Sequence, residues 1–246
     1  MNLGGNTILI TGGASGIGLA FAERFLQAGS KVIICGRRAD KLDEVKEKHP
    51  DIVTRMCDVS KESDRINLTE WVQNEYPDLN ILLNNAGIQQ REPLIQKNEP
   101  WSYHQQEIAI NLEAPIHLAL LFLPLLKSQP LSYIINVTSG LAFAPLANAA
   151  IYSATKAALH SFTLSLRHQL TGTPVQVLEI VPPAVQTDLG GTGVHTFGAP
   201  LKDFADTIML GLETGEQEIG YGTSNLNRKA SRTELNDIFN QMNASR

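Results

Sequence analysis

Short apolar runs of strand length alternate along this 246-residue chain with longer segments whose apolar residues recur at helical spacing. Strands are expected near residues 7–10, 31–35, 52–56, 81–83, 132–137, 175–180 and 218–219, and helices near 16–28, 39–48, 63–76, 105–127, 151–170 and 204–214. This alternation is typical of βαβ units, in which helices cover a parallel sheet. We therefore predict a single α/β domain over residues 1–246, with a Rossmann-type, doubly wound parallel sheet of about seven strands and helices on both faces.

Composition and charge argue against several other classes. The net charge is -5 and the basic runs are only pairs, so a nucleic-acid surface is not expected. Cys35 and Cys57 have no second Cys or His at ligand spacing, so we expect free thiols and no metal site. The first strand comes too early to leave room for a signal peptide, and the apolar stretch 114–126 is shorter than the roughly 20 residues of a membrane span. A cytoplasmic protein is expected.

A glycine-rich turn, T-G-G-A-S-G-I-G at residues 11–18, follows the first expected strand. Backbone N–H groups of such a turn can approach a pyrophosphate because no side chain stands in the way. The helix that follows adds its positive end to the same anion. An ordinary structural turn is the alternative, but the strand before it and the helix after it are the context of a dinucleotide site.

The spacing of this turn, G-x-x-x-G-x-G, resembles that of the short-chain dehydrogenase/reductase family in its shorter subtype. Further motifs support the resemblance in the order typical of the family: N-N-A-G at Asn84–Gly87, then Asn111, Ser139 and Y-S-A-T-K at Tyr152–Lys156. The resemblance covers nearly the whole chain, and the sequence is most similar to the DltE-like branch of the family. It implies an NAD(P)(H)-dependent oxidoreductase that interconverts a carbonyl (ketone or aldehyde) and an alcohol.

Tyr152, Lys156 and Ser139 are the expected catalytic residues. Tyr152 and Lys156 are four apart on an expected helix, so both project from one face. A free tyrosine has a pKa near 10, and we expect the Lys156 ammonium, with the positive nicotinamide, to lower it so that Tyr152 acts as general acid or base. Ser139 follows a strand at the edge where ligands bind, and its hydroxyl can stabilise the carbonyl oxygen. The resemblance further implies that Lys156 holds the nicotinamide ribose and that Asn111 supports a proton relay. Alternatively, Asn111 is a polar interruption of a core helix.

The end of the second strand, C-G-R-R at residues 35–38, bears on the choice of cofactor. An NAD site usually has Asp or Glu about 20 residues after the glycine turn, but Gly36 and Arg37 occupy that place here. A guanidinium can hold a 2′-phosphate by two hydrogen bonds. NADP(H) is therefore favoured, with Arg37 as the clamp and Ser15 and Arg38 as helpers. NAD(H) stays open, because the two arginines could simply begin a solvated helix.

The resemblance extends the cofactor site along the chain. Asp58 matches the residue that hydrogen-bonds the adenine amine, although it could instead cap a helix. Asn84 and Gly87 match the wall beside the adenine ribose, and Thr187 matches the contact to the carboxamide. The expected cofactor-binding residues are Gly12, Ser15, Gly16, Ile17, Gly18, Arg37, Arg38, Asp58, Val59, Asn84, Ala86, Gly87, Tyr152, Lys156, Pro182, Val185 and Thr187. The family usually has Pro-Gly where this chain has Pro182-Pro183, and Pro183 lacks an N–H, so a reshaped nicotinamide wall is expected.

The substrate end is expected at the glycine-rich segment 188–203, which can fold over a substrate or be an ordinary surface loop. The apolar residues expected to line it are Leu141, Phe143, Pro145, Leu146, Pro183 and Val185. No Arg or Lys is obviously aimed at a substrate anion, which favours a neutral ketone or aldehyde. The polar tail 224–246 carries Leu235, Ile238, Phe239 and Met242 on one face of a possible docking helix.

Other functions were weighed against carbonyl reduction. A non-catalytic NADP(H)-sensing regulatory protein often loses the tyrosine or the lysine, and this chain keeps both. A methyltransferase would have an acidic residue near Gly36, and a Ser139 hydrolase, with a base among His160, His168 and His195, would need a G-x-S-x-G elbow. Alcohol oxidation stays open as the reverse direction. The resemblance also implies a homodimer or homotetramer formed through the helices at 105–127 and 151–170.

Overall fold

The seven strands form one parallel sheet in the order β3-β2-β1-β4-β5-β6-β7. The structure, a computed structural model, describes residues 1–91, 94 and 99–244. The strands are β1 (Thr7–Thr11), β2 (Lys31–Gly36), β3 (Val53–Met56), β4 (Ile81–Asn84), β5 (Ser132–Val137), β6 (Val175–Val181) and β7 (Glu218–Gly220). The order reverses direction between β1 and β4, which leaves a crevice at the carboxyl ends of these strands. The predicted Rossmann-type sheet is confirmed.

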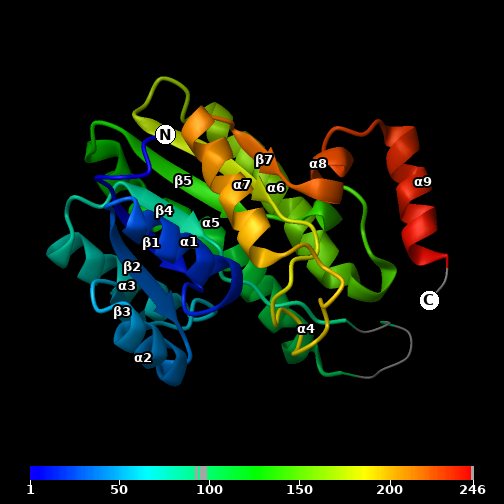
Figure 1. Cartoon of the computed structure of the whole chain (residues 1–246), viewed down its shortest axis with the longest axis horizontal. Helices are drawn as coiled ribbons and strands as arrows, with labels where there is room; N and C mark the ends of the chain where they lie inside the picture. The colour runs from blue at the N-terminus through cyan, green and yellow to red at the C-terminus, as the bar shows by residue number, and fades with distance from the viewer. Residues whose placement is uncertain (92–93, 95–98, 245–246) are drawn as a thin grey trace.

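Helices cover both faces of the sheet (Figure 1). One face carries α1 (Gly16–Gln27), α2 (Ala39–Lys48) and α7 (Leu201–Thr214), whose buried side chains pack together with alternate strand residues such as Ile8 and Ile10. The other carries α3 (Glu62–Glu75), α5 (Ala114–Ser128) and α6 (Ala150–Gln169), which pack with the intervening residues such as Leu9. Because successive strand side chains point to opposite faces, the two apolar cores follow directly from uninterrupted apolar strands.

The long helix expected at 105–127 begins earlier and has three parts: α4 (Trp101–Ile108), a π-helical segment (Ala109–Glu113) and α5. Within the described residues, the stretch 101–128 is long and apolar enough to cross a membrane by length and composition. However, Leu118, Phe122 and Leu126 are buried in the second core. The stretch is therefore a core helix, and its apolar character is explained by packing in a water-soluble fold.

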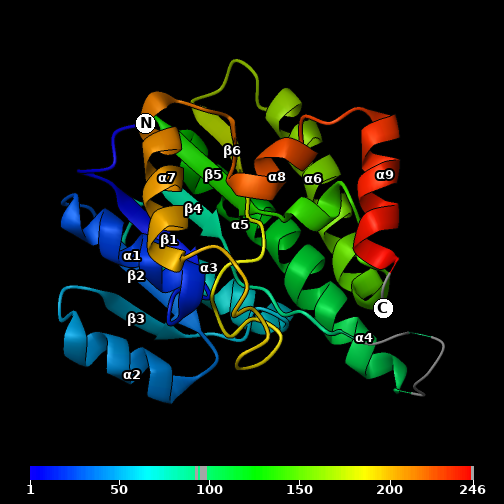
Figure 2. The ribbon, with the colours of Figure 1, turned by 45° about the vertical axis from the view of Figure 1, so that its right-hand side comes forward.

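The end of the chain forms two helices, α8 (Gly222–Asn227) and α9 (Arg232–Asn243), which stand beside α6 in Figure 2. This agrees with the helix expected in the tail, whose last two residues lie outside the described part of the chain. No residue of α9 is fully buried. Asn243 joins α9 to the segment before α6, because its Oδ1 accepts from the Ala147 N–H (2.8 Å) and its Nδ2 donates to the Pro145 carbonyl (3.2 Å).

The two cysteines are close together and unpaired. Because β2 is hydrogen-bonded to β3, Cys35 at the end of one strand lies near Cys57 just after the other, and both are free thiols. A hydrogen bond with Cys57 and burial raise the pKa of Cys35 well above its usual value. The prediction of free thiols is confirmed for these residues, and both side chains are buried.

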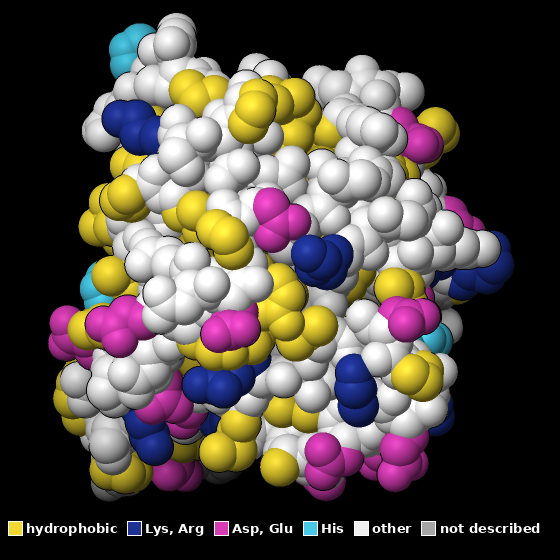
Figure 3. All heavy atoms as spheres, turned by 90° about the vertical axis from the view of Figure 1, so that its left-hand side faces the viewer, with side chains coloured by type: hydrophobic (Ala, Val, Ile, Leu, Met, Phe, Trp, Pro, Cys, Tyr) yellow, Lys and Arg dark blue, Asp and Glu magenta, His cyan; other side chains and the backbone are white. Residues whose placement is uncertain are grey.

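The face that Figure 3 displays carries Lys, Arg, Asp and Glu side chains intermixed with apolar patches. Acidic and basic groups alternate there, so the described part of this face presents no continuous basic surface. The ion pairs between Lys41 and Glu44 (2.7 Å) and between Arg24 and Asp206 (2.6 Å) show the same mixing at atomic distances. Pairing of this kind mainly promotes solubility, since exposed ion pairs contribute little to stability.

Candidate active site

A cavity of about 1680 Å³ runs along the carboxyl edge of the sheet. Its walls come from the segments that follow β1 to β6, together with α6, the loop 188–203 and the helices α8 and α9. Ligands of open parallel sheets bind at this edge, where the order of strands reverses. The cavity is therefore the candidate active site.

The glycine turn after β1 forms one end of this cavity. Gly12 has a φ of +66°, and a Cβ atom there would lie 2.9 Å from the Cα of Ala86. A Cβ at Gly18 would collide with the carbonyl oxygen of Gly12. Thr11 holds the facing segment, because its Oγ1 accepts hydrogen bonds from the N–H groups of Asn85 and Ala86, both at 3.0 Å. Only glycine fits this close approach, which leaves the N-terminus of α1 open to the cavity.

Beyond the turn, two predicted cofactor residues contact one another. The Nη2 atom of Arg38 donates a hydrogen bond to Ser15 Oγ at 2.8 Å. Arg37 lines the same part of the cavity, and both arginines are exposed. A Cβ at Gly36 would meet nothing within 4 Å, so this corner has space beside the guanidinium groups. The structure thus brings the predicted clamp together, with Arg38 rather than Arg37 in contact with Ser15.

Asp58 and Val59 line the cavity beside this corner. Asp58 Oδ1 accepts from the backbone N–H (3.1 Å) and the hydroxyl (2.8 Å) of Ser60. The helix α3 starts at Glu62 with Lys61 at its N-cap, so Asp58 does not cap the helix. The competing helix-cap role for Asp58 is therefore wrong, and its carboxylate belongs to a turn at the cavity wall.

Two of the predicted cofactor residues do not reach the cavity surface. Asn84 lies inside β4, where its Nδ2 donates to Asn136 Oδ1 at 3.0 Å, and the neighbouring Asn85 lines the cavity instead. Gly18 lies behind the turn. The predicted residues that do line it are Gly12, Ser15, Gly16, Ile17, Arg37, Arg38, Asp58, Val59, Ala86, Gly87, Tyr152, Lys156, Pro182, Val185 and Thr187. The position in the cavity wall that was predicted for Asn84 is occupied by Asn85, because β4 continues one residue further than expected.

The three predicted catalytic side chains converge in the middle of the cavity. Tyr152 and Lys156 project from α6, and Ser139 follows β5. Lys156 Nζ donates to the Val137 carbonyl at 2.8 Å and lies 5.7 Å from the centroid of the Tyr152 ring. Ser139 Oγ accepts from the Leu141 N–H at 3.1 Å, and the Ser139 side chain lowers the pKa of Tyr152. All three are buried, so they are held by packing as well as by these bonds.

The pKa values of this group differ in direction from the simple expectation. Burial raises the pKa of Tyr152 to about 12, against the lowering effects of the Ser139 hydrogen bond and the Arg91 charge. Burial also lowers the pKa of Lys156 to about 8, opposed by the charges of Glu107 and Glu179. Desolvation dominates for a phenol so completely enclosed, and Lys156 is not among the groups that shift the Tyr152 pKa. The lowering expected from Lys156 together with the positive nicotinamide stays a prediction. The Lys156 ammonium is directed at a carbonyl oxygen instead.

Asn111 lies in the π-helical segment and is fully buried. Its Oδ1 accepts from the Ile88 N–H (2.9 Å), and its Nδ2 donates to the Ile88 carbonyl (2.8 Å). It does not line the cavity. The side chain thus fastens the segment after β4 to the helix, which fits a positioning role, while the proton relay stays a prediction.

Several residues that sequence reasoning did not single out belong to the site. Arg91 Nη2 lies 2.7 Å from His195 Nε2 and connects the segment after β4 with the loop 188–203. Glu107, on α4, is buried, and its carboxylate accepts from the Gln90 N–H at 2.8 Å. Burial raises the Glu107 pKa to about 7. Glu107 could have been identified from sequence, because it lies four residues before Asn111 and so on the same side of a helix. Arg91 could not, because its contact with His195 crosses 104 residues of sequence and leaves no local pattern.

The substrate end is partly as expected. Leu141, Leu146, Pro183 and Val185 line the cavity, together with Ile238 and Met242 from α9. Phe143 and Pro145 do not line it, and Phe143 packs on His160 with ring centroids 4.7 Å apart. Arg91 also lines the cavity and its charge acts on Tyr152, whereas the expectation that no Arg or Lys is aimed at a substrate anion stays a prediction.

Fold and site together define a dinucleotide-binding α/β protein with a serine, a tyrosine and a lysine in the middle of its crevice. The family model for short chain dehydrogenase matches residues 6–195. The chain belongs to the short-chain dehydrogenase family and is an NAD(P)-dependent oxidoreductase.

Individual relatives agree with this assignment. The chain is 46% identical to an uncharacterized oxidoreductase, DltE, of Bacillus subtilis over 99% of this chain and 98% of the relative. A short chain dehydrogenase from Burkholderia cenocepacia, solved in complex with NADP, is similar with a TM-score of 0.85 and 25% identity, covering 97% of this chain and 99% of that one. One from Burkholderia phymatum, solved with NAD, shares the fold with a TM-score of 0.83 and 21% identity, covering 100% and 98%. Since these neighbours carry different cofactors, the residues of this chain must decide the preference.

Proposed function

We propose that this protein reduces a ketone or aldehyde to an alcohol with NADPH, with Tyr152 as the proton donor. The observation that carries the proposal is the convergence of Tyr152, Ser139 and Lys156 in a cavity whose far end holds the glycine turn. The glycine turn fits a dinucleotide, because Cβ atoms at Gly12 or Gly18 would collide with neighbouring backbone and break the close packing that leaves the N-terminus of α1 open to the cavity. Bound NADPH supplies the hydride to the carbonyl carbon.

Each catalytic side chain has a separate task at the carbonyl oxygen. Tyr152 is protonated at neutral pH, so it can give its phenolic proton to the oxygen as negative charge develops. Ser139, which lines the same part of the cavity, can donate a second hydrogen bond to the same oxygen. The Lys156 ammonium then stabilises the phenolate that remains and reaches the ribose hydroxyls. In the reverse direction, the Tyr152 phenolate would accept the alcohol proton, helped by the positive charge of the oxidised nicotinamide.

The proposed preference for NADP(H) over NAD(H) comes from the arginine corner. Arg37 and Arg38 line the cavity where the adenine ribose of a bound dinucleotide would extend, and Ser15 fixes the Arg38 guanidinium. Asp58 is the proposed partner of the adenine amine, with Val59, Ala86 and Gly87 beside it. Asn84 is not part of the proposed cofactor site, because it does not line the cavity. Pro182, Val185 and Thr187 are the proposed nicotinamide wall, in which Pro183 offers no N–H.

The substrate we propose is a small molecule with an apolar body. Leu141, Leu146, Ile238 and Met242 offer apolar contacts, whereas Arg91 and His195 offer polar ones on the opposite segments. The whole chain is proposed to act as one cytoplasmic domain that assembles into a homodimer or homotetramer through α5 and α6. Leu120 and Leu164, 55% and 43% exposed, are apolar side chains on the free faces of these helices.

A panel of aldehydes, ketones, diketones and ketosteroids, assayed by loss of NADPH absorbance and repeated with NADH, tests the proposal. We expect turnover with NADPH and slower turnover with NADH. The main rival is an NADP(H)-sensing regulatory protein, which would bind NADPH tightly and turn over none of these compounds. Turnover with NADH alone would overturn the assignment of the arginine corner and leave the catalytic assignment in place.

A further inference from the structure

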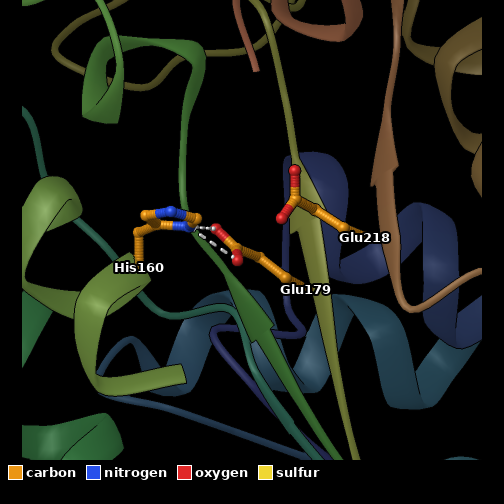
Figure 4. A group of neighbouring side chains, drawn as sticks. All are labelled: His160, Glu179 and Glu218. Atoms are coloured by element: carbon orange, nitrogen blue, oxygen red, sulfur yellow. Dashed lines mark hydrogen bonds and ion pairs between the residues drawn. The ribbon is translucent and has the colours of Figure 1, made fainter. Parts of the chain in front are cut away.

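A buried carboxylate, Glu179, lies directly behind the catalytic residues on β6 and is fully inaccessible to solvent. His160 on α6 donates to it, with Nδ1 at 3.0 and 2.9 Å from the two oxygens. The Thr138 hydroxyl donates to Glu179 Oε1 at 2.6 Å. Figure 4 shows Glu179 between His160 and Glu218, which comes from β7. A carboxylate in such a place needs a function, because burying a charge is costly unless it is paired.

A metal ion is one use for such a group, since ligand atoms of His160, Glu179 and Glu218 lie within 4.8 Å of one another. However, both oxygens of Glu179 already accept hydrogen bonds from His160 or Thr138. Glu218 is paired with Arg228, with Nη1 and Oε1 3.4 Å apart. The donors and charges are therefore matched within the protein, and the cluster is explained as an ion-pair network.

The network is connected to the catalytic residues by three consecutive residues at the end of β5. The Val137 carbonyl accepts from Lys156 Nζ, the Thr138 hydroxyl donates to Glu179, and Ser139 lines the cavity together with Tyr152. His160 is one helical turn after Lys156 on α6. Glu179 therefore fixes the strand end and the helix that together present Ser139, Tyr152 and Lys156.

Charge reinforces this geometric connection. Lys156 faces two buried carboxylates, Glu107 on α4 and Glu179 on β6, both of which raise its pKa against the effect of burial. Glu179 also raises the pKa of His160, as Glu218 does, whereas Arg167 lowers it. Glu179 thus favours the protonated form of His160, and its charge also acts on Lys156.

On the basis of the proposed function, we propose that the buried Glu179–His160 ion pair is a positioning element of this reductase, which fixes the end of β5 through Thr138 and so holds the Val137 carbonyl against Lys156 and Ser139 at the carbonyl oxygen. Glu179 touches neither cofactor nor substrate in this role. Its effect must therefore appear in the titration of Lys156 as well as in turnover.

The experiment follows the ¹³Cε resonance of Lys156 against pH in the full-length protein without cofactor, assigned with Lys156→Arg. Three variants are compared with the wild type. Glu179→Gln keeps the shape and the Thr138 acceptor but loses the charge. Glu179→Asp keeps the charge in a shorter side chain, and Glu218→Gln removes a neighbouring carboxylate that does not shift the Lys156 pKa.

We expect the Lys156 midpoint to fall by about one pH unit in Glu179→Gln, by less in Glu179→Asp, and not in Glu218→Gln. The alkaline fall of kcat/KM should move to lower pH in the same order. A midpoint in Glu179→Gln no lower than in Glu218→Gln would overturn the inference. So would a larger change in Glu179→Asp than in Glu179→Gln, which is the order expected if only packing matters. If the midpoints move as expected but the wild type reduces no carbonyl compound, the proposed function fails while the charge coupling stands.

Discussion

Lys156 Nζ lies 5.7 Å from the centroid of the Tyr152 ring and donates its hydrogen bond to the Val137 carbonyl. The ammonium therefore lies beside the phenol without bonding to it. Burial keeps Tyr152 protonated, with a pKa of about 12, and leaves Lys156 close to losing its proton, with a pKa of about 8. Tyr152 and Lys156 are together suited to giving a proton to a carbonyl oxygen. The Tyr152 phenol carries its proton, and the Lys156 ammonium can stabilise the phenolate that forms.

Replacing Tyr152 with Phe should lower kcat by roughly 10²- to 10⁴-fold, because proton donation by a positioned side chain contributes about that much. The Kd for NADPH should change less than about threefold, since the ring stays in place. Steady-state kinetics and fluorescence titration with NADPH measure the two effects. Tyr133→Phe is the matched control, because Tyr133 is buried in β5 outside the cavity. Near-wild-type turnover in Tyr152→Phe would contradict the proton-donor assignment.

The rate of carbonyl reduction should depend on pH through Lys156. The Lys156 pKa is lowered to about 8, so the ammonium is present below that pH and is lost above it. Tyr152 stays protonated across this range. We therefore expect kcat/KM for reduction to be level up to about pH 8 and to fall at higher pH. In Lys156→Arg, whose guanidinium stays charged, any remaining activity should lack this fall. An unchanged alkaline fall in that variant would show that another group is responsible.

Glu107 should make the protein less stable as pH rises. Its folded pKa, raised to about 7 from an ordinary value of 4.5, means that the folded state binds more protons than the unfolded state between those values. The free energy of unfolding then falls through this window, by about 3 kcal/mol for a fully desolvated group and by on the order of 1 to 2 kcal/mol after solvent screening. Glu107→Gln keeps the acceptor for the Gln90 N–H and should remove this dependence.

Urea denaturation at several pH values between about 5 and 8 measures the effect of Glu107 as the difference between variant and wild type. Glu47→Gln, at an exposed position on α2, serves as the control for removing a carboxylate. Parallel stability curves for Glu107→Gln and the wild type would show that Glu107 is ionised throughout.

The arginine corner should set the preference for NADPH. Arg38→Ala should raise the Kd for NADPH by about tenfold or more and leave the Kd for NADH nearly unchanged, because a charged hydrogen bond to a phosphate is lost. Gly36→Asp, at a position with open space around its Cβ, should repel the 2′-phosphate and favour NADH. Arg55→Ala, which removes a guanidinium that lies over Trp71, is the control. Equal losses for both cofactors in Arg38→Ala would mean that Arg38 contacts a part they share.

Local patterns predict the strands and helices well, and the reason is physical. β5 occupies the expected residues 132–137, because a strand buried on both faces is mostly apolar, and all six of its residues are buried. The helix that holds Asn111 begins four residues before its expected start. The pattern of apolar residues does not reveal this start, because Trp101 is 64% exposed and adds nothing to an apolar face. The π-helical segment around Asn111 also has no sequence pattern of its own.

The catalytic motif could be recognised from sequence, but its surroundings could not. Tyr152 and Lys156 lie four apart on one helix, whereas the partners that set their pKa values come from elsewhere in the chain. Arg91 meets His195 across 104 residues, and Glu179 meets His160 only because β6 lies against α6. Burial, which reverses the expected shift of the Tyr152 pKa, depends on the packing of the entire cavity.

Transfer of deuterium from NADPH labelled at C4 of the nicotinamide to a carbonyl compound tests the central claim most directly. The best substrate of the panel is incubated with the labelled cofactor and with the wild type or Tyr152→Phe, and the alcohol is analysed by mass spectrometry and NMR. The account predicts one deuterium on the carbinol carbon with the wild type and little product with Tyr152→Phe. Alcohol without deuterium, or equal yields from the two proteins, would contradict it.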